Sequence, residues 1–88
     1  MTGTTLEQEV IGVIQACRGL IPDSQLDEMV DLANHAEWGI ALENLCTQLD
    51  EHHAILDEVT LARIEQLGTR MKLAPDYWLR LKRSPFRD

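Results

Sequence analysis

The sequence predicts an all-α fold, a small antiparallel bundle of four main helices with a short fifth helix at the C-terminal end. Apolar residues recur at steps of three and four along four separate stretches. Residues that commonly begin or end helices lie between these stretches, and no stretch of strand length alternates apolar and polar residues. Because the connections are short, neighbouring helices are expected to run antiparallel.

Two helices are predicted in the first part of the chain. Thr4 and Glu7 have the spacing of a capping box, and Gly19 is placed to end the helix that follows. A turn with several N-cap candidates comes next, so the second helix is expected over residues 23–35. The two apolar stripes comprise Leu6, Val10, Val13, Ile14 and Cys17, and then Leu26, Met29, Val30 and Ala33.

The rest of the chain predicts a central third helix, a fourth helix and a short fifth one. The third follows a turn at residues 35–39 and has the strongest periodicity in the sequence. Asp57 can cap the fourth helix, Gly68 weakens it, and Pro75 suits the first position of the fifth. The stripes comprise Trp38, Ala41, Leu42, Leu45, Cys46 and Leu49, then Leu61, Ile64, Leu67 and Met71, then Tyr77, Trp78 and Leu81. Their spacing favours core positions for both tryptophans.

The chain has the length of one domain. At 88 residues and 10.0 kDa, we expect a single helical domain over residues 1–82 and a flexible tail over 83–88. No apolar run reaches the roughly 18 to 20 residues that cross a bilayer, and the first residues do not read as a signal peptide, so the expected location is the cytoplasm. Cys17 and Cys46 lie on apolar stripes, which favours buried reduced thiols over a disulfide.

Negative charge is concentrated in the middle of the chain. The net charge is −7, but residues 19–58 contain ten acidic residues and no Lys or Arg, whereas residues 67–88 contain six basic and two acidic residues. A single carboxylate on a helix usually lies on the solvent-facing side and has no further role. Here, however, Asp23, Asp27 and Asp31 place like charges at i,i+4, which costs helix stability. The pattern therefore favours a binding role.

A concentrated negative field repels nucleic acids and anionic membranes and attracts basic protein surfaces. The predicted partner is therefore a basic protein, with no direct binding to nucleic acid or membrane. Asp27 and Asp31 lie off the apolar stripe of their helix, so we expect them to be exposed. The carboxylates predicted to contact the partner are Asp23, Asp27, Asp31, Glu37, Glu43, Asp50 and Glu51.

Other kinds of site find little support. His52 and His53 stand beside acidic residues, but adjacent helical side chains point about 100° apart and no His-x-x-x-His spacing occurs, so no metal site is predicted. Cysteines among Val, Ile and Leu are poor nucleophiles, and no glycine loop suited to phosphate is present. We expect neither enzymatic activity nor a cofactor.

One run of residues resembles a known family. The run Glu37-Trp38-Gly39-x-Ala41-x-Glu43-x-Leu45-Cys46-x-x-Leu49 is similar to the central motif of the MafI-type immunity proteins, small cytoplasmic partners of bacterial polymorphic toxins. The similarity extends upstream through Leu20-Ile21-Pro22-Asp23 and downstream through Leu67-Gly68-x-x-Met71-x-Leu73-x-Pro75-x-Tyr77-Trp78-x-x-Leu81. It therefore covers residues 20–81. At two places where the family often has glycine or a glycine-like helix end, this chain has Ala36 and Lys72.

The resemblance implies that the protein neutralises a cognate toxin, commonly a nuclease, by tight binding and performs no reaction itself. The matching positions are mostly apolar or turn residues, so they would determine the fold rather than contact the toxin. The alternative hypothesis is a non-catalytic regulatory or adaptor module that binds another basic protein and could dimerise through an apolar face. An upstream gene for a large secreted protein with a basic C-terminal domain would favour the immunity role.

Overall fold

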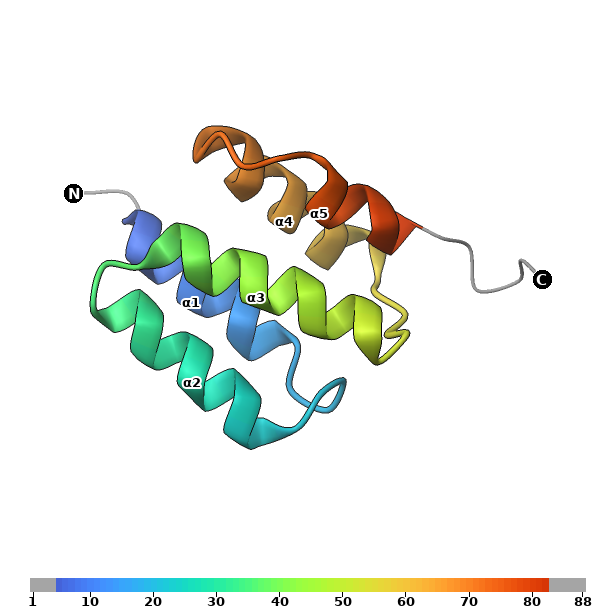
Figure 1. Ribbon diagram of the computed structural model, residues 1–88, viewed down its shortest axis with the longest axis horizontal. Coiled ribbons are helices and arrows are strands. Elements are labelled where there is room, and N and C mark those ends of the chain that lie inside the picture. The colour runs from blue at the N-terminus through green and yellow to red at the C-terminus, as the bar shows by residue number, and fades with distance from the viewer. Residues whose placement is uncertain (1–4, 83–88) are drawn as a thin grey trace.

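The structure is a computed structural model, and it describes residues 5–82. These residues contain helices and no β-strand, apart from an isolated bridge between Arg18 and Ile21. The predicted all-α class and the order of four main helices and a short fifth are confirmed (Figure 1). The expected tail at 83–88 lies outside the described residues. The elements are α1 (Leu6–Ala16), α2 (Asp23–Asn34), α3 (Trp38–Glu51), α4 (Glu58–Arg70), α5 (Asp76–Leu79) and a 3₁₀ turn, η1 (Arg80–Lys82).

The first three helices form an antiparallel bundle in which each contacts the other two (Figure 1). Helix α4 packs on α1, and α5 with η1 packs across α3 and α4. Helix α3 is therefore the central element, as predicted, because it contacts every other helix. The apolar stripes meet in one core of Val10, Val13, Ile14, Cys17, Ile21, Leu26, Met29, Ala33, Ala41, Leu42, Leu45, Cys46, Leu49, Ala54, Ile64, Leu67, Trp78 and Leu81.

The ends of α1 differ from the prediction. The capping box of α1 is formed by Thr5 and Gln8, where each backbone N–H donates to the side-chain oxygen of the other residue at 3.1 Å. Thr4, which was predicted to form the box with Glu7, lies outside the described residues. Both pairs have the required spacing, so spacing alone does not choose between them. The helix ends at Ala16, and Gly19 (φ 93°) instead completes a turn in which the N–H of Leu20 donates to the carbonyl of Cys17 at 3.0 Å.

Helices α2, α3 and α4 all end in a Schellman motif, in which the residue after the C-cap adopts the left-handed conformation. None of these three residues is glycine: they are Ala36, His53 and Lys72, with φ of 65°, 52° and 61°. In each motif the next N–H donates at 2.9 Å to a carbonyl five residues back, from Glu37 to Leu32, Ala54 to Leu49 and Leu73 to Gly68. Because the left-handed conformation is unfavourable for residues with a Cβ, each site carries strain that glycine would relieve.

Gly68 in α4 is required by the packing of Trp78, a role that was not predicted from the sequence beside its weakening of the helix. A Cβ at residue 68 would lie closer than 3.0 Å to three atoms of the Trp78 ring. Trp78 is 4% exposed, so its predicted core position is confirmed. Trp38 is only half-buried, and its indole N–H donates to the carbonyl of Ala33 at 3.0 Å. The Trp78 ring packs α5 against α4, and the Trp38 ring links the start of α3 to the end of α2.

Candidate partner-binding surface

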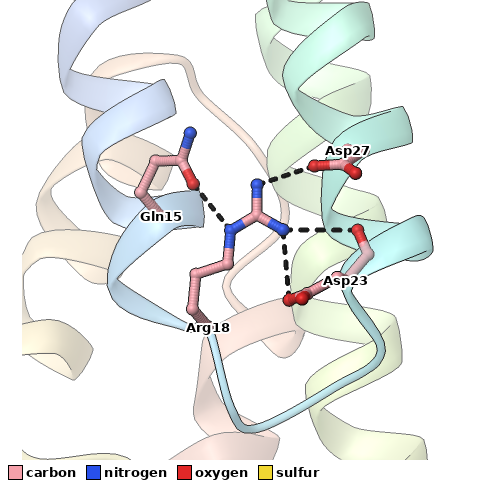
Figure 2. A network of polar contacts seen from close by, with 4 residues as sticks. All are labelled: Gln15, Arg18, Asp23 and Asp27. Carbon is pink, nitrogen blue, oxygen red and sulfur yellow. Dashed lines mark hydrogen bonds and ion pairs between the residues drawn. The ribbon is translucent and has the colours of Figure 1, made fainter.

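Arg18, in the turn after α1, holds the first two aspartates of α2 (Figure 2). Its Nη2 donates to Asp27 Oδ1 at 2.7 Å, and its Nη1 lies 3.2 Å from Asp23 Oδ1 and 3.3 Å from the Asp23 carbonyl. Its Nε donates to Gln15 Oε1 at 2.8 Å. All three guanidinium nitrogens are therefore engaged, and the hydrogen bonds to the two aspartates raise the pKa of Arg18 above its usual range.

Because of this contact, the row of Asp23, Asp27 and Asp31 on α2 is not a series of unpaired like charges, as the sequence suggested. The acidic stretch without Lys or Arg begins at residue 19, one residue after the arginine that bridges Asp23 and Asp27. The like-charge penalty at these two positions is therefore offset within the chain. A binding role for the row has to rest on carboxylates that Arg18 does not reach.

Asp31, the third aspartate of the row, lies beside a histidine and not beside an arginine. The carboxylate lies 3.7 Å from His35 Nδ1, which donates to the Asp31 backbone carbonyl at 2.8 Å. That backbone hydrogen bond, assisted by the charge of Asp31, raises the pKa of His35. Both side chains are largely exposed, at 72% for His35 and 73% for Asp31. Asp31 therefore remains accessible from solvent, as the sequence predicted.

A groove lies between α2 and α3, with a volume of about 690 Å³. Its lining contains three carboxylates, three amides and two apolar side chains, and no Lys, Arg or His. The residues are Asp27, Glu28 and Asp31, then Gln25, Asn44 and Gln48, then Met29 and Leu32. Glu28 was absent from the predicted site, although its i,i+3 spacing to Asp31 placed it on the same side of the helix. The structure thus gathers part of the predicted acidic set into a concave surface.

Gln25, a residue of the groove lining, has a buried side-chain oxygen, Oε1, without a hydrogen-bond partner within residues 5–82. A buried polar atom left without a partner costs about 1–3 kcal/mol. Because this atom is buried, the acceptors that the groove offers to a partner are its carboxylates.

The remaining predicted carboxylates do not belong to this groove. Asp50 and Glu51 line a separate pocket of about 100 Å³ with Tyr77 and Arg80, between α3 and α5. Along α3, Asn44 and Gln48 lie one turn apart and face α2, whereas Asp50 lies about 200° further around the helix from Gln48. The seven predicted residues therefore do not form one surface.

Glu37 and Glu43 also lie outside the groove lining. Glu37 is exposed at the N-cap of α3, where its side chain makes no capping hydrogen bond. Glu43 is half-buried on α3, close enough to Cys46 for its charge to raise the pKa of that thiol. Neither residue shares a pocket with Asp27 or Asp31 in the part of the chain that the structure describes.

The two thiols lie in the core without a disulfide between them. Burial is the main cause that raises the pKa of Cys17 to about 11 and that of Cys46 to about 12, so both are protonated at neutral pH. Within residues 5–82, no three His, Cys, Asp or Glu side chains are grouped so that they could hold a metal ion. No helix in the same range is long and apolar enough to cross a membrane.

Comparison with known proteins gives no match: no family model fits the chain, and neither a curated protein nor a solved structure is significantly similar to it.

Proposed function

We propose that this chain is an immunity protein that binds a basic toxin domain in the cytoplasm and neutralises it without performing a reaction. The observation that carries the proposal is the α2–α3 groove, in which Glu28 and Asp31, two carboxylates that Arg18 does not reach, lie beside Asp27 without a basic residue in the lining. Such a surface attracts basic proteins and accelerates their association. It disfavours nucleic acid and anionic membranes, whose phosphates carry the same sign of charge.

The resemblance to MafI-type immunity proteins supplies the class of partner. The residues that carry the resemblance serve the fold here: Leu45, Cys46, Leu49, Trp78 and Leu81 are all buried. This agrees with the implied role of the motif as a determinant of structure. The groove lies mostly on α2, outside the central motif, so partner specificity can vary while the core motif stays the same.

The experiment pairs this chain with the basic C-terminal domain of a secreted protein encoded directly upstream of its gene. Bacterial cells produce that domain with this protein, with an empty vector, or with an unrelated immunity protein. We expect growth to be restored by this protein alone, and the purified pair to elute as one complex. Cells that die despite good production of this protein, with no complex formed, would contradict the immunity role.

A regulatory or adaptor module is the second candidate, and two exposed apolar side chains favour it. Ile55, in the loop before α4, and Val59, in the first turn of α4, are 63% and 69% exposed. Exposed apolar side chains of this size are frequent at interaction surfaces when they cluster. A concentration-dependent dimer that Ile55→Lys abolishes, together with a regulatory gene as neighbour, would favour this candidate over immunity.

A further inference from the structure

We infer that the outer face of α4 is the interface of a parallel homodimer, in which the α4 helices of two copies lie side by side and pair their charges across a two-fold axis. The residues of this face, all exposed, are Val59, Ala62, Gln66 and Thr69. The inference does not depend on the proposed function, because α2 and α4 lie on opposite sides of α3 (Figure 1). A second copy bound to α4 therefore leaves the α2–α3 groove open.

The face has the spacing of a coiled-coil seam. Its four residues are separated by steps of three, four and three, so they lie along one side of the helix. The opposite side of α4 is buried in the core through Thr60, Ile64, Leu67 and Gly68. The seam begins with Val59, an apolar side chain that is 69% exposed. Within the described chain, this side of the helix is left without a packing partner.

The middle of the seam has room for a second helix. Ala62, Gln66 and Thr69 line a hollow of about 600 Å³, together with Glu65 and Arg70. Helix α4 has 13 residues and is therefore about 20 Å long. A contact of this length lies at the low end of interface sizes, where complexes are weak and transient. The dimer is therefore expected to form only at high protein concentration.

The edge of the seam that faces α1 is basic. Arg70 Nη1 donates to Glu9 Oε1 of α1 at 2.7 Å. Arg63 lies one heptad earlier on the same edge, and its Nη2 would be 2.9 Å from a Cβ placed on Gly12 of α1. The absence of a side chain at Gly12 thus lets this arginine lie against α1 while it remains exposed.

The other edge of the seam is acidic. Glu65 Oε1 lies 3.0 Å from Lys82 Nζ of η1, so this edge faces away from α1. Glu58 lies two turns earlier on the same edge. The charges beside the seam are therefore separated by sign, with two arginines along one edge and two glutamates along the other.

These two edges are complementary only when two copies of α4 run parallel. In a parallel pair, a residue on one edge of the seam faces the residue five positions later on the other edge of the second helix. Glu58 then faces the second copy's Arg63. Glu65 faces the second copy's Arg70, and the two-fold axis repeats both pairs. In an antiparallel pair each edge meets itself, so that like charges face each other. Charge complementarity therefore selects a second copy of this chain in the parallel orientation.

All four charged side chains are available for these pairs. Glu58 and Arg63 make no side-chain hydrogen bond or ion pair within residues 5–82. The side chains of Glu65 and Arg70 are 44% and 55% exposed, and each uses one atom in its contact within the chain. A carboxylate can accept further hydrogen bonds, and a guanidinium can donate further ones. Exposed ion pairs are individually weak, so these fix the orientation more than the affinity.

The test measures the mass of the full chain by sedimentation equilibrium between about 10 μM and about 1 mM. We expect the average mass to rise from 10.0 kDa toward twice that value. Glu58→Arg and Arg63→Glu should each raise the dissociation constant of the dimer about fivefold or more, because each turns two attractive pairs into two repulsive ones. The variant with both changes restores the complementarity of the parallel dimer and should return to within about twofold of the unchanged protein.

Two variants control for general effects of charge. Glu51→Arg and Arg80→Glu make the same changes at exposed positions outside α4, and we expect them to leave the dissociation constant unchanged. A chain that stays monomeric over the whole range, a double variant no better than the single ones, or equal weakening by the controls would overturn the inference. Circular dichroism checks the fold of each variant, and a misfolded single variant would not be rescued by the second charge change.

Crosslinking tests the orientation separately. Thr69→Cys places an exposed thiol on the seam, where the two-fold axis of a parallel dimer brings it beside the same residue of the second copy. A short bismaleimide should join two copies of this variant, whereas Cys17 and Cys46 are buried and should not react. Ser24→Cys, exposed on α2, is the control and should not be joined. Crosslinks between Thr69→Cys and Val59→Cys chains, but not between two Thr69→Cys chains, would show antiparallel helices and overturn the inference.

Discussion

Arg18 Nη2 lies 2.7 Å from Asp27 Oδ1, and this ion pair ties the turn after α1 to the second turn of α2. The same guanidinium contacts Asp23, at the start of α2, where Pro22 provides no side-chain cap. One arginine thus bridges two like charges, although its guanidinium, which only donates, cannot accept hydrogen bonds from the N–H groups of the first turn. It also divides the acidic row into a part neutralised within the chain and a part, at Glu28 and Asp31, that faces solvent and the groove.

Arg18→Gln should loosen the start of α2. Without the guanidinium, Asp23 and Asp27 repel each other and the first turn opens more often, so the amide protons of Gln25 and Leu26 should exchange up to about tenfold faster. Both N–H groups donate to the carbonyl of Pro22. Arg18→Lys should rescue only part of the protection, because an ammonium cannot bridge both aspartates and Gln15.

Arg80→Gln makes the same change of charge beside the α3–α5 pocket and provides the matched control. Exchange at Gln25 and Leu26 should not change in this variant. Equal acceleration in both variants would mean that net charge, and not the bridge from Arg18, protects α2.

Gly68→Ala should destabilise the protein by about 1–3 kcal/mol, because the new methyl group overlaps the Trp78 ring and one of them has to move. Urea unfolding measures the loss, and tryptophan fluorescence should report a more exposed ring. Gly39→Ala is the control in α3: its Cβ would meet only Leu73 Cδ2, at 3.5 Å. It should be stabilising or neutral, by less than about 1 kcal/mol. Similar losses in both variants would refute the specific packing of Trp78 on Gly68.

Ala36→Gly and Lys72→Gly should each stabilise the protein by about 0.5–1 kcal/mol, since both residues have a positive φ. These are also the two positions where the resembled family often has glycine or a glycine-like helix end. Ala62→Gly, at an exposed position within α4, should instead destabilise by about 1 kcal/mol. Thermal unfolding of the three variants distinguishes them, and destabilisation by Ala36→Gly would show that the left-handed conformation is not under strain.

Asp57 should make stability depend on pH in the acidic range. Hydrogen bonds from the Thr60 hydroxyl and backbone N–H lower the pKa of this carboxyl, the backbone bond at 2.8 Å. The unfolded chain then binds the proton more readily, at a pKa of about 3.9, so the contribution is present above that pH and is lost as the pH falls through the folded pKa.

Asp57→Asn keeps a capping side chain but does not titrate. Urea midpoints measured between pH 7 and pH 2.5 should therefore fall more steeply below pH 4 for the unchanged protein than for the variant. Parallel curves would contradict the stabilising role of the ionised cap.

The helices could be predicted because their apolar spacing is a local property of the sequence. The core positions of α2 and α3, such as Leu26 and Leu45, follow directly from steps of three and four. The cap of α1 was shifted by one residue because two overlapping pairs satisfy the same pattern. The role of Gly68 could not be predicted, since it depends on Trp78, which lies ten residues away and arrives from another helix.

The candidate surface was predictable only in part. The spacing along α2 indicated exposed aspartates, and the structure places Asp27 and Asp31 at the groove. Which face of α3 meets α2 is set by packing in three dimensions, so the sequence grouped Asp50 and Glu51 with carboxylates from which the structure separates them. Arg18 was missed because a count of charge along the chain does not detect a contact across a turn.

The central claim is that the α2–α3 groove binds a basic partner, and the most direct test compares two pairs of charge reversals. Glu28→Lys with Asp31→Lys alters the groove, whereas Glu51→Lys with Glu58→Lys alters exposed positions outside it and shifts the net charge equally. The dissociation constant for the basic domain encoded upstream is measured by calorimetry at physiological salt. We predict that the groove pair weakens binding at least about 100-fold and the other pair less than about tenfold, because distant surface charges are screened. Equal weakening by both pairs, or full affinity in the groove pair, would contradict the claim.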